Sequence, residues 1–198
     1  MTTLYHSPNS RSSSLVALVE ELGAAVDIKE VTITRNDGSG GPDPLNPHPE
    51  KKVPYLVDGN EKIRERGAIV LYLTDKFPEA GLGPIEGQPG RGEYLSWLFY
   101  YQGIMEPVGV FHFTGLTHPA LTATFRDFDT MVQRLAEALE DQPYLLGDRY
   151  SAADLLCSSP FNWAPDLMPD NQAIRDWVAR CSDRPAVRRI MEQDKRAA

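Results

Sequence analysis

The chain has 198 residues, of which 41% are hydrophobic and 24% charged, and its formal net charge is −8. This composition is that of an ordinary soluble globular protein, with enough chain for one good core or two small ones. The negative charge argues against general binding to nucleic acid or an anionic membrane, because both need a basic surface. No signal-like N-terminus or membrane-spanning apolar run is evident, so we expect a cytoplasmic protein.

The two cysteines, Cys157 and Cys181, lie in separate helix-like stretches, far apart in sequence. Their spacing is not that of a disulfide framework, a zinc site or a CxxC redox pair. The four histidines show no metal-ligand spacing and no pairing of a nucleophile with a base. We therefore expect a reducing compartment and no metal.

The first part of the chain changes its hydrophobic period repeatedly. Residues 3–7 read as a strand, and residues 10–23 read as a helix that stops at Gly23. A second strand follows over residues 26–33, and residues 34–52 are too rich in Gly, Pro, Asn and Asp to be anything but a loop. Beyond this loop we expect a hairpin around "DGN" and then an apolar helix that Pro78 closes.

The rest of the chain is helical in pattern. Residues 79–92 hold several Gly and Pro residues and read as a linker. Helical stretches then cover residues 91–113, 120–141 and 151–164, and two more lie on either side of Pro185. The sequence predicts an α/β domain over residues 1–78, a linker over 79–92 and an all-α domain over 93–198.

Pro54 begins the apolar stretch "VPYLV" and has no N–H to donate, so it cannot sit in the middle of a central strand. It fits the first position of a strand, above all if the Val53–Pro54 bond is cis. A cis bond would turn the N–H and C=O of Val53 away from the sheet, where an extended peptide ligand can pair with both. An edge-strand proline without any ligand is the alternative.

Glu65 and Arg66 stand just before the apolar helix that opens near Gly67. A helix start presents unpaired N–H groups and partial positive charge, which favour a carboxylate ligand. Arg66 would add a carboxylate clamp and Glu65 would receive an ammonium group, so an α-amino acid end would suit the pair. A solvated charged turn is the alternative.

Three segments together resemble the glutathione S-transferase family. Residues 46–73, "NPHPEKKVPYLVDGNEKIRERGAIVLYL", look like its glutathione-binding segment, and residues 7–23 look like its first strand–helix unit. Residues 143–156, "PYLLGDRYSAADLL", look like its C-terminal capping-box segment. The resemblance covers nearly the whole chain in the family's order. It implies a thioredoxin-like N-terminal domain, an all-helical C-terminal domain, glutathione as cosubstrate, a role in detoxification and a homodimer.

The resemblance also implies roles for single residues. Val53 would offer its backbone to the cysteinyl part of glutathione, and Glu65 and Arg66 would meet the γ-glutamyl end. Lys52 would meet the glycine carboxylate, with Lys51 and His48 as alternatives in the same loop. The family usually has Ser or Thr where Arg66 stands, so the Arg66 backbone N–H is a further candidate and Glu65 ranks above the Arg66 side chain as a ligand.

Ser10 is the first choice for the catalytic group, because it falls where serine-type members of the family carry their catalytic serine. Ser12 is the second choice. A thiol with a pKa of about 8.5 is only roughly 3% thiolate at pH 7, and a hydroxyl donor near a helix start would lower that pKa. Helix capping is the alternative role for either serine. Tyr5 is a third candidate, although its place in a strand favours packing in the core.

The second substrate is expected between the domains, on the long helix of residues 91–113. Tyr101 and Met105 are the candidates to line an apolar pocket there, with Trp163 closing it from a facing helix; core packing is the default role of such residues. Asp154 has a different explanation. Ser151 and Asp154 have the spacing of a capping box, so we assign Asp154 to folding rather than catalysis.

The leading hypothesis is a glutathione transferase whose thiolate attacks an apolar electrophile. A non-catalytic binding or interaction module with the same fold is the alternative, supported by the departure at Arg66. A thiol–disulfide oxidoreductase is rejected, because it needs an active-site cysteine and the first domain has none.

Overall fold

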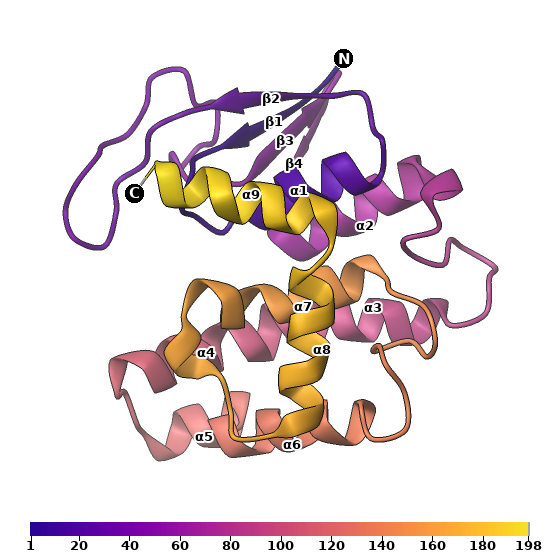
Figure 1. Cartoon of the computed structure of the whole chain (residues 1–198). Helices are drawn as coiled ribbons and strands as arrows, with labels where there is room; N and C mark the ends of the chain where they lie inside the picture. The colour runs from indigo at the N-terminus through magenta and orange to yellow at the C-terminus, as the bar shows by residue number, and fades with distance from the viewer. Residues whose placement is uncertain (198) are drawn as a thin grey trace. The chain divides into compact units, whose positions relative to one another are not determined.

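The computed structural model describes residues 1–197, which form two compact units (Figure 1). Unit 1 comprises Met1–Ala80 together with the described residues from Pro185 onward, and unit 2 comprises Gly81–Arg184. The last helix therefore belongs with the N-terminal unit, whereas the sequence grouped it with the helical residues 93–198. Unit 1 is α/β and unit 2 is helical, which is the predicted fold class.

Unit 1 is built on a mixed sheet with the strand order β2-β1-β3-β4. The strands are β1 (Thr2–His6), β2 (Val26–Glu30), β3 (Tyr55–Asp58) and β4 (Glu61–Ile63). β1 runs parallel to β2 and antiparallel to β3, and β3 and β4 form the hairpin expected around Gly59. The residues between β2 and β3 contain no helix, as their Gly and Pro content predicts.

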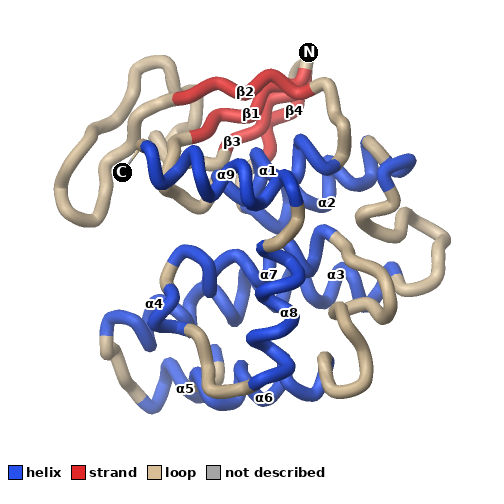
Figure 2. The backbone as a smooth tube through the Cα atoms, in the orientation of Figure 1, coloured by secondary structure: helices blue, strands red, loops and turns tan. Residues whose placement is uncertain are grey.

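Three helices of unit 1 cover one face of this sheet, as Figures 1 and 2 both show. They are α1 (Ser13–Glu21), α2 (Arg66–Lys76) and α9 (Pro185–Arg196), and a short 3₁₀ turn, η1 (Pro78–Ala80), follows α2. The core between sheet and helices consists of fully buried aliphatic side chains. These are Leu4, Leu15, Leu18, Leu56, Ile69 and Leu73. Burying this apolar surface is the main term that stabilises the unit.

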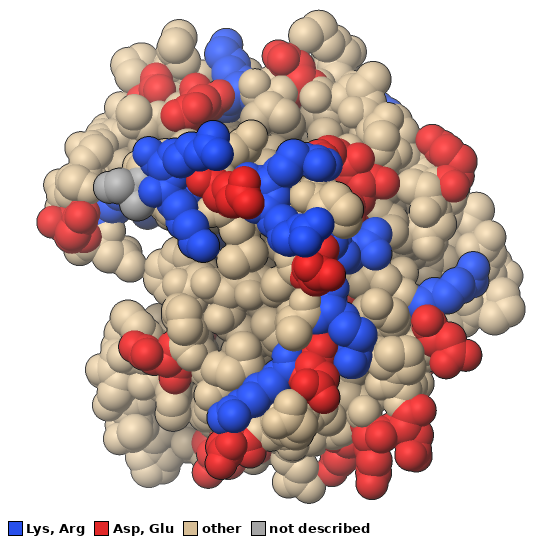
Figure 3. Space-filling view, viewed as in Figure 1, with Lys and Arg blue, Asp and Glu red and all other residues tan. Residues whose placement is uncertain are grey.

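The C-terminal helix α9 packs along α1. Its inner side carries Val187 and Ile190, which are buried. Its outer side is strongly charged, and Figure 3 shows basic and acidic side chains interspersed over this helix. Arg189 forms an ion pair with Glu20 of α1. The amphipathic pattern of α9 thus uses its apolar stripe to complete the core of unit 1.

Unit 2 is a bundle of helices. They are α3 (Arg91–Tyr100), the π-helical turn η2 (Tyr101–Met105), α4 (Glu106–Thr114), α5 (Pro119–Phe125), α6 (Phe128–Ala138), α7 (Ala152–Trp163), the 3₁₀ turn η3 (Pro165–Leu167) and α8 (Gln172–Ser182). The sequence predicted one helix over residues 120–141, and this was wrong. The chain turns out of the helix at Arg126, whose φ is 73°, and Asp127 then caps α6 by accepting the Thr130 N–H at 2.8 Å.

The capping box at the start of α7 is present, as predicted. Asp154 is fully buried and accepts four hydrogen bonds. Oδ2 accepts from the N–H and the hydroxyl of Ser151, and Oδ1 accepts from the Leu145 N–H and the indole N–H of Trp177, all at 2.8–2.9 Å. This carboxylate joins three segments of unit 2, and its role is structural.

None of the helices in residues 1–197 combines the length and the apolarity needed to cross a bilayer.

Candidate functional site

The register of the sheet decides which segments meet. Tyr5, near the end of β1, pairs with Tyr55 at the beginning of β3. The chain leaving β1 therefore lies beside the chain entering β3. Ile63, the last residue of β4, pairs with Leu56, so β4 also ends here. We call this end of the sheet the site end.

Three segments that the sequence singled out lie at the site end. They are the serine-rich turn of residues 7–12, the loop of residues 46–54 and the start of α2. Strand pairing thus brings the predicted catalytic serines and the predicted glutathione-binding residues to one end of the sheet, although Ser10 and Arg66 are more than fifty residues apart in sequence.

Ser12 and Ser10 occupy different positions in the serine-rich turn. Ser12 immediately precedes α1, and its side chain is fully buried. Its Oγ lies 2.8 Å from Nδ1 of His6 and 2.7 Å from Oγ of Ser10, and it accepts the Ser7 N–H at 3.1 Å. Ser10 is half-buried, and its hydroxyl donates to the Ser7 carbonyl oxygen at 2.7 Å. Of the two predicted catalytic serines, only Ser10 is partly open to solvent.

Two distant residues hold the serine-rich turn in shape. Arg35, from the long loop, donates to the carbonyl oxygens of Pro8 at 2.8 Å and Asn9 at 3.1 Å. Asp194, on α9, accepts the Asn9 N–H at 2.8 Å, and its backbone carbonyl accepts from the Asn9 side-chain amide at 2.7 Å. These bonds fix Asn9 in the left-handed region, with φ of 53°. Neither Arg35 nor Asp194 has a sequence signature, because both act through tertiary contacts.

His6, the last residue of β1, was also not predicted as a site residue. The residue is only 9% exposed. Burial lowers the pKa of His6 from 6.5 to about 4, against a smaller opposing effect of the Asp194 charge. The imidazole is therefore neutral at pH 7.

The loop that leads into β3 is organised by Asn46, which is fully buried. Its side-chain amide donates to the Lys52 carbonyl oxygen at 3.1 Å, and its side-chain oxygen accepts the His48 N–H at 3.0 Å. The Val53–Pro54 bond is cis. Among residues 1–197, the N–H and C=O of Val53 have no hydrogen-bond partner. Val53 is half-buried, and an extended peptide can pair with both groups.

The same loop distinguishes the three cationic candidates. Lys51 donates its ammonium to the Asn46 carbonyl oxygen at 2.6 Å. His48 is buried, with its ring 5.0 Å from that of Tyr55. Lys52 is exposed. Lys52 is therefore the candidate whose side chain extends into solvent.

Glu65 and Arg66 differ in exposure at the start of α2. Glu65 is exposed and has a φ of 66°, a conformation that costs a non-glycine residue free energy. Arg66 is only 7% exposed and is the first residue of the helix. Glu65 is therefore open to solvent and Arg66 is not, so the two residues predicted as a pair differ in their surroundings. The first N–H groups of α2 have no partner within the helix and carry partial positive charge.

The predicted second-substrate residues lie in unit 2. Tyr101 and Met105 are the first and last residues of the π-helical turn η2, and both are buried. The Tyr101 hydroxyl donates to the Glu106 carboxylate. Trp163 is 54% exposed at the end of α7, with its ring 6.4 Å from that of Phe113. A π-helical turn often occurs at functional sites, but Tyr101 and Met105 are also well placed as core.

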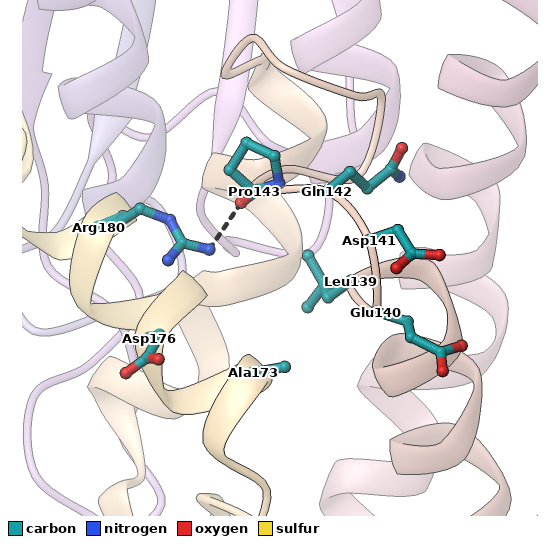
Figure 4. A pocket seen from close by; sticks show the side chains of 8 residues that line it. All are labelled: Leu139, Glu140, Asp141, Gln142, Pro143, Ala173, Asp176 and Arg180. Atoms are coloured by element: carbon teal, nitrogen blue, oxygen red, sulfur yellow. Dashed lines mark hydrogen bonds between the residues drawn. The ribbon is translucent and has the colours of Figure 1, made fainter.

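A separate groove of about 340 Å³ lies on unit 2 and is drawn in Figure 4. It is lined by Leu139, Glu140, Asp141, Gln142, Pro143, Ala173, Asp176 and Arg180. Arg180, the basic residue in this lining, already donates to the Pro143 carbonyl oxygen at 2.8 Å. None of the residues predicted to be functional lines this groove. Among residues 1–197, no group of three or more His, Cys, Asp or Glu side chains is placed to hold a metal ion.

Comparison with known proteins identifies the family of the chain. The family described as "Glutathione S-transferase, N-terminal domain" matches residues 1–75, and "Glutathione S-transferase, C-terminal domain" matches residues 118–185. The chain belongs to the glutathione S-transferase family, and the resemblance inferred from the sequence is confirmed. The thioredoxin-like and helical architecture is that of the family.

Relatives of the chain carry different functional names. An uncharacterized GST-like protein of Streptococcus mutans is 32% identical over 90% of this chain and 76% of its own length. The disulfide-bond oxidoreductase YfcG of Escherichia coli is 29% identical over 94% of this chain and 92% of its own length. A sphingomonad glutathione S-transferase, solved in complex with glutathione, is 25% identical with a TM-score of 0.78 and covers 98% of both chains.

Proposed function

We propose that this protein is a cytoplasmic glutathione transferase that activates the thiol of glutathione for attack on an apolar electrophile. One observation carries the proposal. The partly exposed hydroxyl of Ser10 and the unpartnered backbone of Val53 lie at the same end of one sheet. A peptide that pairs with Val53 would bring its thiol to the turn that holds Ser10.

We infer the binding position of glutathione from the residues at the site end. The cysteinyl part of glutathione pairs with the backbone of Val53, beyond the cis bond to Pro54. The exposed ammonium of Lys52 meets the glycine carboxylate. At the other end, the γ-glutamyl carboxylate meets the first N–H groups of α2 at Arg66, and Glu65 receives the γ-glutamyl ammonium. The low exposure of Arg66 supports a role for its backbone N–H rather than for its side chain.

Ser10 stabilises the thiolate by donating its hydroxyl hydrogen to the sulfur. Lowering a thiol pKa by about two units makes the thiolate the major form at pH 7 and requires about 2.7 kcal/mol. A charge-assisted hydrogen bond together with the start of α1 is sufficient to supply this free energy. Ser12 is the weaker candidate, because its hydroxyl is fully buried and already bonded to His6 and Ser10.

The second substrate would contact residues of unit 2. The proposed second-substrate residues are Tyr101, Met105 and Trp163. Trp163 is the most direct candidate to contact the electrophile, because its side chain is exposed. Family membership supports a homodimer with a role in detoxification.

The test is an ultraviolet titration of enzyme-bound glutathione, which follows thiolate absorbance against pH. We expect the wild type to bind glutathione saturably with a thiol pKa well below that of free glutathione. Ser10→Ala should raise that pKa by about two units, which is a loss of about 100-fold in thiolate at low pH. Ser14→Ala is the matched control, because Ser14 lies in the first turn of α1 and its hydroxyl donates to the Arg11 carbonyl oxygen at 3.1 Å.

Two other results of the titration would contradict parts of the proposal. A lowered pKa that Ser10→Ala leaves unchanged would move the role to Ser12 or to a backbone N–H. No saturable binding by the wild type would overturn the transferase proposal and favour a non-catalytic binding module.

Disulfide reduction is a second candidate, because a relative that is 29% identical is named a disulfide-bond oxidoreductase. The lack of a cysteine in the first 80 residues argues against a mixed disulfide with the protein, but glutathione can supply both thiols. Its thiolate would attack one sulfur of a disulfide and release the other as a thiolate. A second glutathione would then resolve the mixed disulfide and leave oxidised glutathione and a second thiol. Parallel assays with an aryl halide and a small disulfide distinguish the two candidates.

A further inference from the structure

A row of three side chains connects the inside of unit 1 with the serine-rich turn. It starts at the buried imidazole of His6, passes through the fully buried hydroxyl of Ser12 and ends at the half-buried hydroxyl of Ser10. The two links measure 2.8 Å between Nδ1 of His6 and Oγ of Ser12, and 2.7 Å between the two serine oxygens. The thiolate proposal uses only the last member of this row.

The number of hydrogens and lone pairs restricts how the row can be arranged. A hydroxyl donates one hydrogen bond and accepts two. Ser12 accepts one from the Ser7 N–H at 3.1 Å, so one further lone pair and its own hydrogen remain. Ser10 accepts one from the Ser12 N–H at 3.1 Å and has the same two groups left. The direction of the row therefore depends on which way the bond between His6 and Ser12 points.

If Nδ1 of His6 carries the hydrogen, every bond in the row points outward. Ser12 then accepts from His6 and uses its own hydrogen on Ser10, since its other acceptor, the Ser7 carbonyl oxygen, is farther away at 3.3 Å. Both lone pairs of Ser10 are filled, so this hydroxyl can only donate. Without a ligand it donates to the Ser7 carbonyl oxygen at 2.7 Å.

A donor-only hydroxyl distinguishes a thiolate from a thiol. It can donate to S⁻ but cannot accept from S–H, so it stabilises only the charged form and lowers the thiol pKa. If the hydrogen of His6 were on Nε2 instead, Ser12 would donate inward to Nδ1. Ser10 would then keep a free lone pair and could accept from the neutral thiol, which would remove part of the discrimination.

We propose that His6 is a positioning residue that, with its hydrogen on Nδ1, directs the hydrogen of Ser12 to Ser10 and the hydrogen of Ser10 to the sulfur of the ligand. This inference rests on the proposed function, because it assigns the sulfur to glutathione. His6 touches no reacting atom and acts only through the two serines. Successive hydrogen bonds in one direction also polarise one another, which strengthens the last donor.

The surroundings of His6 fit this role. Its low exposure and its pKa of about 4 keep the ring neutral at pH 7, so the direction of the row depends on the tautomer and not on a positive charge. Asp194 of α9 is the charged group whose field acts on the ring, and it also holds the neighbouring Asn9. The row is thereby isolated from solvent except at Ser10.

The first measurement is made on the wild type without any ligand. A long-range proton–nitrogen correlation spectrum of the imidazole rings reports which ring nitrogen carries the hydrogen, and His6→Asn identifies the signal among the four histidines. We expect Nδ1 of His6 to be protonated at pH 7. A hydrogen on Nε2 would overturn the inference whatever the protein binds.

The second measurement is the pKa of bound glutathione in variants of His6. An Asn amide can occupy the place of Nδ1 and donate, whereas Phe keeps the ring volume and donates nothing. We expect His6→Phe to raise the thiol pKa by about one unit, a tenfold loss of thiolate, and His6→Asn to stay near the wild type. Equal effects of the two variants would overturn the inference.

A double-variant cycle separates positioning from a general structural effect. Because His6 acts through Ser10, His6→Phe should change the thiol pKa no further once Ser10→Ala is present. A shift of the same size in both backgrounds would show that His6 acts by another route. The wild-type titration distinguishes failure of the proposed function from failure of the His6 inference. If the wild type binds no glutathione, the proposed function has failed. The tautomer of His6 still shows the direction of the hydrogen bonds in the row.

Discussion

Within residues 1–197, two helices begin next to a serine, and the two serines use their hydroxyl groups differently. Ser151 precedes α7 in unit 2, and its N–H and hydroxyl both donate to the Asp154 carboxylate within the first turn of that helix. Ser12 precedes α1 in unit 1, and its side chain makes no capping bond to its own helix. Its hydroxyl instead connects His6 with Ser10.

Hydrogen-bond partners distinguish a serine that stabilises a helix start from one whose hydroxyl belongs to a longer row. Both residues match the N-cap preference for serine, so the sequence alone does not distinguish their roles. At α7 the polar groups satisfy one another, and fully satisfied networks stabilise a fold. At α1 the row of hydroxyls ends at the half-buried Ser10, where an additional acceptor can join it.

The largest effect on stability is expected from Asp154. Asp154→Ala removes the acceptor of four hydrogen bonds and leaves the Trp177 indole N–H and the Leu145 N–H buried without partners. The capping box alone would account for about 1 kcal/mol, but the additional bonds raise the expected loss in unfolding free energy to about 3–5 kcal/mol. Chemical denaturation measures it.

Asp154→Asn is the matched control for this prediction. It keeps the shape and one acceptor oxygen, so its loss should be smaller. Glutathione affinity should be unchanged in any Asp154 variant that remains folded. A large loss of affinity in such a variant would contradict the structural role.

The next largest effect is a pH dependence of the unfolding free energy, which comes from His6. Its pKa is about 4 in the folded protein and 6.5 in the unfolded chain, so between these values the unfolded chain binds more protons. The folded state therefore loses stability as the pH falls from 6.5 to 4, by roughly 3 kcal/mol in total. His48, whose pKa is also lowered by burial, contributes in the same direction.

The difference between the wild type and His6→Asn isolates the His6 contribution. Unfolding free energies of both proteins should be measured at several values between pH 7 and pH 4. The difference in unfolding free energy between the two proteins should change between pH 6.5 and pH 4. Parallel curves would show that His6 is already protonated in the folded protein or that it is not buried.

The sequence predicted the fold class and several local features of the structure because their signals are local. Pro54 at a strand start, the Gly-rich loop and the capping box each depend on neighbouring residues, and the structure contains the expected hairpin, the cis bond and the box. The break in the helix near residue 126 was not predicted, since amphipathic periodicity continues through it.

The residues that shape the site end could not be predicted. Arg35, Asn46 and Asp194 act through contacts between segments that are distant in sequence, and a single charged or amide residue in a loop has no periodic or turn signature. His6 is hidden for a different reason. It falls in an alternating strand, where a lone histidine most often reads as ordinary packing, and only the distance from Nδ1 to the Ser12 hydroxyl reveals its bond.

The smallest expected effect compares the two serines directly. Ser151→Ala loses one hydroxyl donor at a helix start, and its unfolding free energy should fall by about 1 kcal/mol. Ser12→Ala should cost a similar or somewhat larger amount, because its buried hydroxyl has several partners. The two variants should separate in the titration of bound glutathione, where Ser12→Ala raises the thiol pKa and Ser151→Ala does not. A shift in both variants would mean that the titration reports general loosening of the fold. A shift in neither would mean that Ser10 acts without the row behind it.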